Sequence, residues 1–88
     1  MKKYSVLLEK AAARFLLQIR DAKLKSRLDE AIESLASDPR PSGCRKLSGT
    51  SDRYRIRIGH YRIIYRIDDG KVTVLVLVIG HRREVYEG

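Results

Sequence analysis

The feature that most constrains the fold of this chain is the alternation of side chains in two neighbouring segments, residues 54–58 and 61–67. Successive side chains of a β-strand point to opposite faces, so this alternation predicts two strands, over residues 54–58 and 61–67. Gly59 and His60 separate the two strands. A glycine in the first position of a two-residue loop is typical of a type II′ turn, which closes a tight hairpin.

The two faces of this hairpin differ in their chemistry. One face is apolar or aromatic throughout and is expected to pack on helices; it carries Tyr54, Ile56, Ile58, Tyr61, Ile63, Tyr65 and Ile67. The other face is expected to be exposed and strongly basic; it carries Arg53, Arg55, Arg57, Arg62, Ile64 and Arg66.

The expected turn pairs arginines across the hairpin. It places Arg57 opposite Arg62 and Arg53 opposite Arg66, and like charges in such pairs destabilise a sheet. No acidic residue on this hairpin face offsets them. We therefore expect the face to bind a polyanion or a partner that supplies carboxylates. The alternative is a solvated charged surface that discourages aggregation through sheet edges.

The first half of the chain is expected to be mainly helical. A short apolar strand over residues 4–8 precedes two stretches, residues 11–19 and 24–35, whose apolar side chains recur with helical spacing. These stretches predict a hairpin of two helices, with one long helix as the alternative. Asp38 precedes Pro39 and is expected to end the second helix, because a residue before proline avoids the helical region.

The second half of the chain is expected to complete a sheet. Residues 38–53 have the composition of a long loop, and residues 68–70 that of a turn. The apolar, β-branched segment Val72–Ile79 predicts a central strand covered on both faces. The expected fold is a single α+β domain over residues 1–88, in the order β-α-α-β-β-β. Its helical hairpin packs on one face of a small, mainly antiparallel sheet.

Charge and composition narrow the class of function. The chain has 19 basic and 11 acidic side chains, and nine of the eleven basic residues after residue 39 are arginines. Arginine suits phosphate recognition, so the second half points to nucleic acid. The longest apolar stretch, Val74–Ile79, is far shorter than the about 20 residues of a membrane span. Met1–Tyr4 does not resemble a signal peptide, which predicts a cytoplasmic protein.

Metal and cofactor chemistry is not expected. Cys44 is the single cysteine, which excludes an internal disulfide and a cysteine-based zinc site. The two histidines come without clustered carboxylates, and the sequence has no glycine-rich phosphate loop.

A cluster of chemically versatile residues follows the apolar strand. Within a few positions it holds an imidazole, two guanidinium groups, a carboxylate and a phenol: His81, Arg82, Arg83, Glu84 and Tyr86. Polar residues after a central strand lie at the edge of the sheet, so we expect this cluster beside the basic face. An imidazole can donate or accept a proton, which makes His81 a candidate, but a single histidine after a strand is more often structural. Tyr86 either packs its ring on the sheet or takes part in function.

Three segments together resemble one known family. They are Lys46-Leu-Ser-Gly49, Tyr54-Arg-Ile-Arg-Ile-Gly-His-Tyr-Arg-Ile-Ile-Tyr65 and Gly80-His-Arg-Arg-Glu-Val-Tyr86. Their order and spacing resemble the RelE/ParE toxin superfamily, and its RelE branch in particular, over essentially the whole chain. The resemblance implies the toxin of a type II toxin–antitoxin system. It implies an endoribonuclease that cuts mRNA in the ribosomal A site through attack by the ribose 2′-hydroxyl, without metal or cofactor.

The resemblance also implies site residues. The positions that match the catalytic residues of the family are Arg55, Arg57, Arg62, Arg82 and Tyr86. Arginines are poor proton acceptors, so Arg57 and Arg62 are expected to stabilise the phosphorane. His81 joins the candidates as an alternative to Arg82 for the general acid and to Tyr86 for the base. The further basic residues expected to contact RNA are Arg45, Lys46, Arg53, Arg66 and Arg83.

The implied partners are the ribosome, mRNA and a small RelB-like antitoxin, acidic or amphipathic, whose complex with the toxin binds operator DNA. Three other readings stay open. A ParE-like protein would poison DNA gyrase by protein contact without nuclease residues. A non-catalytic RNA-binding module would need exposed aromatic side chains. An inactive toxin homologue would act only as the partner of an antitoxin.

Overall fold

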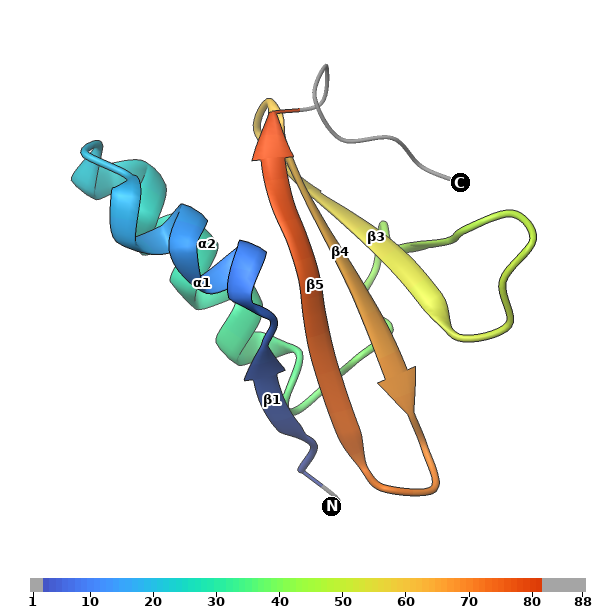
Figure 1. Cartoon of the computed structure of the whole chain (residues 1–88). Coiled ribbons are helices and arrows are strands. Elements are labelled where there is room, and N and C mark those ends of the chain that lie inside the picture. The colour runs from blue at the N-terminus through green and yellow to red at the C-terminus, as the bar shows by residue number, and fades with distance from the viewer. Residues whose placement is uncertain (1–2, 82–88) are drawn as a thin grey trace.

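Two helices lie side by side on one face of a five-stranded sheet in this computed structural model, which describes residues 3–81 (Figure 1). In chain order the elements are β1 (Ser5–Leu8), α1 (Lys10–Gln18), α2 (Ala22–Ser34), β2 (Arg45–Lys46), β3 (Arg53–Ile58), β4 (Tyr61–Asp68) and β5 (Thr73–His81). The strand order is β1-β5-β4-β3-β2, and only β1 and β5 pair in parallel among the described strands. This architecture confirms the expected α+β class.

The helical region is a hairpin of two helices, so the alternative of one long helix is wrong. The break lies at Ile19, whose backbone is extended, and α2 starts at Ala22, directly after its N-cap residue Asp21. The Asp21 carboxylate accepts hydrogen bonds from the backbone N–H groups of Lys23 and Leu24, at 3.0 and 3.2 Å. A side chain that caps free N–H groups in this way marks the start of a helix even without glycine or proline. The second helix ends at Ser34, before Asp38.

The hairpin of β3 and β4 has the expected register. Ile58 pairs with Tyr61, Arg57 with Arg62 and Arg53 with Arg66. Gly59 has φ +61°, whereas His60 is not among the residues with positive φ. A type I′ turn needs positive φ at both positions, so the turn is the glycine-first type II′.

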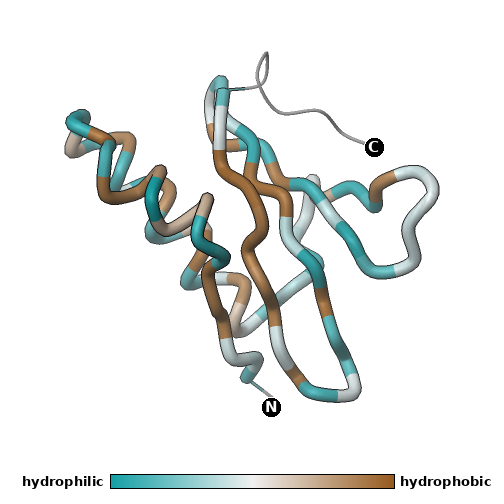
Figure 2. The backbone as a smooth tube through the Cα atoms, viewed as in Figure 1, coloured by the Kyte–Doolittle hydropathy of each residue, from teal (hydrophilic) through white to brown (hydrophobic). Residues whose placement is uncertain are grey.

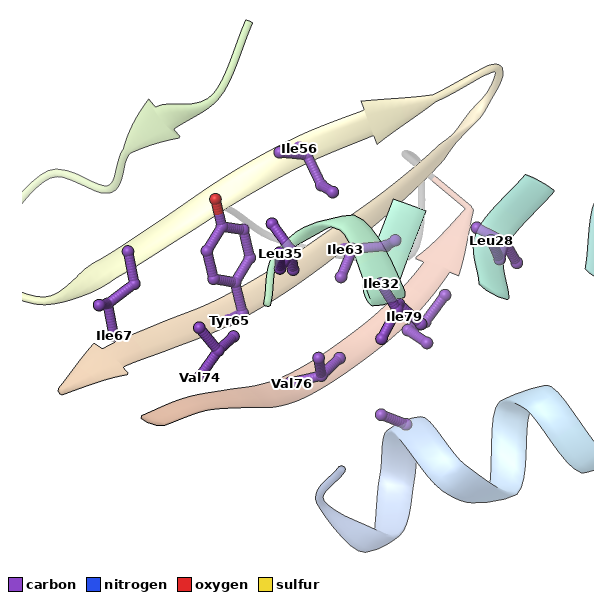
Figure 3. Close-up of a cluster of buried hydrophobic side chains, with 11 residues drawn as sticks. Leu28, Ile32, Leu35, Ile56, Ile63, Tyr65, Ile67, Val74, Val76 and Ile79 are labelled. Atoms are coloured by element: carbon purple, nitrogen blue, oxygen red, sulfur yellow. The ribbon is translucent and has the colours of Figure 1, made fainter. Parts of the chain in front are cut away.

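The core lies between the sheet and the helices. Figure 3 shows side chains of β3, β4 and β5 pointing toward Leu28, Ile32 and Leu35 of α2. The strands contribute Ile56, Ile63, Tyr65, Ile67, Val74, Val76 and Ile79. The three aromatic residues Tyr54, Phe15 and Tyr61 pack against this cluster. The apolar face of the hairpin is therefore confirmed as the helix-facing side.

Two expectations about the second half of the chain are corrected. The segment expected to be a loop contains β2, which pairs with Tyr54 and Arg55 of β3. β5 is central, and Figure 2 shows its apolar character along most of its length. However, β5 is not covered on both faces, because the helices reach one side only and Val78 on the other side is 37% exposed. The strand begins at Thr73, since Val72 has φ +50° and ends the turn.

Candidate active site

Arginines from three neighbouring strands share the sheet face that points away from the helices. We call this surface the arginine face. It consists of Arg45 of β2, Arg53, Arg55 and Arg57 of β3, and Arg62 and Arg66 of β4. Strand pairing brings these residues together, because alternation puts every second side chain of each strand on the same face.

Like charges lie opposite each other at three places on the arginine face. Besides the two pairs in the hairpin, Arg45 of β2 lies opposite Arg55. Asp52 comes no closer than 4.0 Å to the guanidinium Nε of Arg66, in an exposed ion pair of little energetic weight. Several cations held this close raise the local concentration of anions, so the face suits a phosphate backbone.

The centre of the arginine face is covered, which differs from the open surface expected. Leu47, just after β2, packs with Ile64 and Leu77 in a second small apolar cluster. Its backbone N–H donates a 2.9 Å hydrogen bond to the carbonyl oxygen of Arg53, which holds the segment in place. Arg55, which neighbours Ile64 across the strands, is only 5% exposed. Burial of Ile64 under Leu47 explains why one isoleucine interrupts the row of arginines.

The arginines that remain accessible lie around this covered centre. Arg45, Arg53, Arg57 and Arg66 are exposed, and Arg62 is half-buried. Arg57 and Arg62 form the pair next to the turn, at the end of the sheet where β5 also ends. The accessible pair nearest the end of β5 is therefore Arg57 and Arg62.

His81 lies on the other side of the sheet from these arginines. It pairs with Tyr61, a helix-facing residue, whereas Gly80 pairs with Arg62. The His81 ring packs edge-on against Tyr61, with centroids 5.5 Å apart, and stacks at 6.1 Å with His60. The structure thus groups His81 with two aromatic rings near the turn.

A register shift in β5 explains the position of His81. Ile64 pairs with Val78 but the next residue, Tyr65, pairs with Val76, so β5 has one extra residue at Leu77. An extra residue on one strand is a β-bulge, and it reverses which face each later side chain occupies. Without it, His81 would lie on the arginine face.

The remaining candidates differ in placement. Lys46 is exposed and pairs with Tyr54, so it belongs to the helix-facing side of the sheet. Arg82, Arg83 and Tyr86 lie outside the described residues, and their roles stay predictions. β5 ends at His81, at the end of the sheet that holds the Arg57–Arg62 pair.

A polar cluster that sequence reasoning missed lies at the far end of the sheet. The guanidinium of Arg40 contacts the carboxylate of Asp69 at 2.8 Å and donates to the hydroxyl of Tyr54 at 3.2 Å. The hydroxyl of Tyr4 donates to Asp69 at 2.6 Å, and this bond raises the pKa of Tyr4. These residues tie the chain start, the segment after α2 and the β4–β5 turn together. They lie far apart in the sequence, so no local pattern could have revealed them.

Two observations on the described part of the chain concern metals and membranes. Among residues 3–81, no three His, Cys, Asp or Glu side chains are grouped closely enough to hold a metal ion. None of the helices described is long and apolar enough to cross a membrane.

Comparison with known proteins identifies the class of this fold and face. Residues 6–86 match the family described as ParE toxin of type II toxin-antitoxin system, parDE. The chain therefore belongs to this family of type II toxins. The relatives described next place it in the RelE-like branch of the RelE/ParE superfamily.

Three known proteins of this branch are similar to the chain. Toxin RelG of Mycobacterium tuberculosis is 34% identical over 86 residues, which cover 94% of this chain and 95% of RelG. The mRNA interferase toxin RelE of Escherichia coli is 40% identical over 68 residues, covering 73% of this chain and 66% of that protein. The crystal structure of the RelE–RelB complex from Pyrococcus horikoshii superposes with a TM-score of 0.79 at 28% identity, covering 94% of this chain and 99% of the other.

Proposed function

We propose that this toxin is a ribosome-dependent, metal-independent endoribonuclease that cuts mRNA in the A site and so stops translation. The observation that carries the proposal is the Arg57–Arg62 pair, two cations that lie directly opposite each other at the end of the sheet where β5 ends. The E. coli relative is named an mRNA interferase, which supports the same activity.

The proposed reaction needs two proton transfers and the stabilisation of one developing charge, with no outside reagent. The ribose 2′-oxygen attacks the adjacent phosphorus while a base takes its proton, and the bond to the 5′-oxygen breaks as an acid protonates that oxygen. The products are a 2′,3′-cyclic phosphate and a 5′-hydroxyl. Between these states the phosphorane carries extra negative charge, which preorganised cations stabilise.

The roles follow from chemistry and position. Arg57 and Arg62 stabilise the phosphorane, since a guanidinium group presents several N–H donors to phosphate oxygens. Arg55 is buried beside them, and its fixed charge adds to the potential of the site. Tyr86 is the proposed base. We assign the general acid to Arg82, because His81 lies on the helix-facing side.

RNA would follow the exposed cations on either side of this pair. Arg45, Arg53 and Arg66 are exposed on the same face and would contact phosphates. Long-range attraction to ribosomal RNA suits a chain with net charge +8. The place of action is then the cytoplasm, where translation takes place.

The partner that restrains such a toxin is a cognate antitoxin. Structures similar to this one are complexes of RelE with RelB, from P. horikoshii and from E. coli. We propose a RelB-like antitoxin for this chain, and that the complex of the two binds operator DNA.

The test is induced expression in a bacterium, followed by primer extension on a translated reporter mRNA. Cuts that need translation and follow the reading frame are the expected result. Arg62→Ala should abolish these cuts, whereas Arg14→Ala, on the exposed side of α1, should leave them unchanged. Wild-type cleavage by a folded Arg62→Ala variant contradicts the assigned site.

The family that matches the chain is named after the ParE toxin. The alternative function is therefore that of a ParE-like poison of DNA gyrase. Growth arrest with intact mRNA would favour that function. Absence of both toxicity and cleavage, with folded protein present, would favour an inactive homologue or a simple binding module.

A further inference from the structure

The two margins of the sheet differ in their chemistry. β2 forms one margin and consists of Arg45 and Lys46, whereas β1 forms the other and has the uncharged sequence Ser-Val-Leu-Leu. Charged residues at a margin discourage pairing with a further chain. β1 has none, and two of its leucines are exposed, Leu7 by 55% and Leu8 by 41%. The β1 margin is therefore the better suited of the two to association.

The backbone groups of β1 alternate between two directions. The N–H groups of Ser5 and Glu9 donate hydrogen bonds toward β5, at 2.9 and 2.8 Å. In a strand, the N–H and C=O of one residue point to one side and those of the next residue to the other. The even-numbered residues of β1 therefore direct their backbone groups away from the sheet.

Part of this outer side is already occupied. The N–H of Tyr4 donates to the carbonyl oxygen of Ala36, just after α2, at 2.8 Å. Val6 and Leu8 lie beyond that contact, and none of the described strands lies on this side of β1 (Figure 1). The N–H and C=O groups of these two residues are thus open to another strand.

We propose that β1 binds the β1 strand of a second copy of this chain in antiparallel orientation, with the two Leu7 residues opposite each other on a twofold axis. Val6 of each copy then pairs with Leu8 of the other, and the members of each pair exchange backbone hydrogen bonds. This register uses the outward-facing groups that Ala36 leaves open. The proposal does not depend on the nuclease activity proposed above.

Apolar side chains meet on both faces of the paired strands. Leu7 lies on the same side as the arginines, because it pairs with Leu75, which in turn pairs with Arg66. Residues in a pair without hydrogen bonds lie close together, so the two Leu7 side chains contact each other across the axis. On the helix-facing side, the exposed Leu8 lies next to Val6 of the second copy. The contact therefore removes apolar surface from water on both faces.

The charges at the ends of β1 fit the same orientation. Lys3 precedes the strand and Glu9 follows it. Antiparallel pairing brings the start of one strand beside the end of the other, so each Lys3 comes near the Glu9 of the second copy. These contacts offset part of the repulsion between two chains of net charge +8. The strand is complementary to itself, which favours a second copy over a different partner.

The proposed dimer also determines where the two arginine faces lie. A twofold axis between antiparallel edge strands is perpendicular to the sheet, so the two sheets continue into each other and both arginine faces lie on the same side. A polyanion long enough to reach both faces binds two sites at once, which strengthens its overall binding.

The first experiment measures the molar mass of the full-length chain by sedimentation equilibrium, at about 0.3 M salt to screen the net charge. The interface is small, and small interfaces associate weakly. We therefore expect monomers at about 1 µM and mostly dimers at about 1 mM, with a dissociation constant on the order of 100 µM. A chain that stays monomeric up to about 1 mM would overturn the proposal.

A matched pair of variants locates the interface. Leu7→Lys puts two like charges opposite each other on the axis and should weaken dimerisation about tenfold or more. Leu17→Lys makes the same change at a leucine of α1 that is 84% exposed, and should alter the affinity by no more than about twofold. Equal effects of the two changes would contradict the β1 interface, and loss of the dimer in Leu17→Lys alone would assign the contact to α1.

A charge exchange tests the orientation and does not require Leu7→Lys to fold. Lys3→Glu alone should weaken dimerisation about threefold or more, because two glutamates then approach each other at each end. The double variant Lys3→Glu with Glu9→Lys should restore the affinity to within about twofold of the wild type. A double variant as weak as the single one would contradict antiparallel pairing.

Disulfide trapping tests the register. In a Cys44→Ser background, which removes the single native cysteine, Leu7→Cys should form a disulfide-linked dimer under mild oxidation. Ser5→Cys is the control, because its Cα atom would lie about 13 Å from that of the second copy, too far for a disulfide. Equal yields of linked dimer from the two variants, or none from Leu7→Cys, would refute the register.

Discussion

Tyr65 donates its hydroxyl hydrogen bond to the carbonyl oxygen of Pro39 across 2.8 Å. Tyr65 is fully buried, and Pro39 is buried as well. Burial raises the pKa of Tyr65 above its ordinary value near 10, and nearby Cys44 raises it further. The bond anchors the segment after α2 to the centre of β4, so the hydroxyl must stay protonated in the folded chain.

The first prediction concerns stability at high pH. A raised pKa in the folded state stabilises the fold fully below pH 10, and this contribution is lost as the pH rises above 10. Tyr65→Phe should cost about 1–3 kcal/mol at pH 7, because the Pro39 carbonyl loses its donor. Its difference from the wild type should shrink above pH 10. Urea unfolding at pH 7 and 11 measures the free energy of unfolding of the wild type and of the variant. A stability difference between them that grows with pH would contradict a protonated Tyr65 hydroxyl that donates to Pro39.

The second prediction separates stability from function at the Arg57–Arg62 pair. Arg57→Glu replaces a repulsive pair by an attractive one, so it should raise the free energy of unfolding by about 0.2–1 kcal/mol. The same variant should lose mRNA cleavage. Arg57→Lys keeps the charge and serves as the stability control. Thermal melts of the two variants and the wild type measure this difference in stability. A less stable Arg57→Glu variant would show that the charges of residues 57 and 62 do not repel each other in the wild type.

The third prediction tests which hairpin face is buried. Ile63 is fully buried on the helix-facing side, so Ile63→Asp should destabilise the domain by about 4 kcal/mol or more and unfold it. Arg66→Asp introduces the same residue on the exposed face of the same strand and should cost about 1 kcal/mol or less. Circular dichroism melts compare the two. A cooperative melt of Ile63→Asp at the wild-type temperature would mean that the faces are exchanged.

The fourth prediction concerns backbone strain at Val72. Its φ of +50° lies in the left-handed region, where a β-branched side chain is unfavourable. Replacement by glycine should therefore give a chain about 1 kcal/mol more stable than replacement by alanine. In an ordinary strand the order of these two variants is reversed. Chemical denaturation of Val72→Gly and Val72→Ala measures the difference, and greater stability of the alanine variant would refute the strain.

The fifth prediction concerns the proposed base. Tyr86→Phe removes a phenol proton acceptor but keeps the ring, so single-turnover cleavage should slow by about 100-fold or more, while ribosome binding changes little. Rapid-quench cleavage on programmed ribosomes gives the rate, and co-sedimentation gives the binding. Equal cleavage rates of wild type and variant would remove Tyr86 as the base.

Local patterns accounted for much of the fold. The alternation in the hairpin and the position of Gly59 predicted the buried face and both arginine pairs. Such predictions succeed because the alternation of side chains along a strand follows from its local backbone geometry. The helix boundary at Asp21 also has a local cause, a carboxylate that caps two backbone N–H groups in the first turn of α2.

Other features depended on contacts between distant segments. Leu47 covers Ile64 because a two-residue strand carries it over the sheet, and this contact buries part of the arginine face. The extra residue of β5 transfers His81 to the helix-facing side. Neither the length of β2 nor the bulge leaves a clear pattern in the sequence, since each depends on how the strands fit together.

The sequence alone determined that this chain forms a basic hairpin backed by a helical pair, because periodic side-chain chemistry decides which face must leave water. Tertiary structure decided which cations stay accessible, on which face the histidine lies and where the strand edge stays open. Those properties arise from strand pairing and from packing between residues far apart in the chain, where one extra residue reverses a face and one leucine covers an isoleucine in the row of arginines.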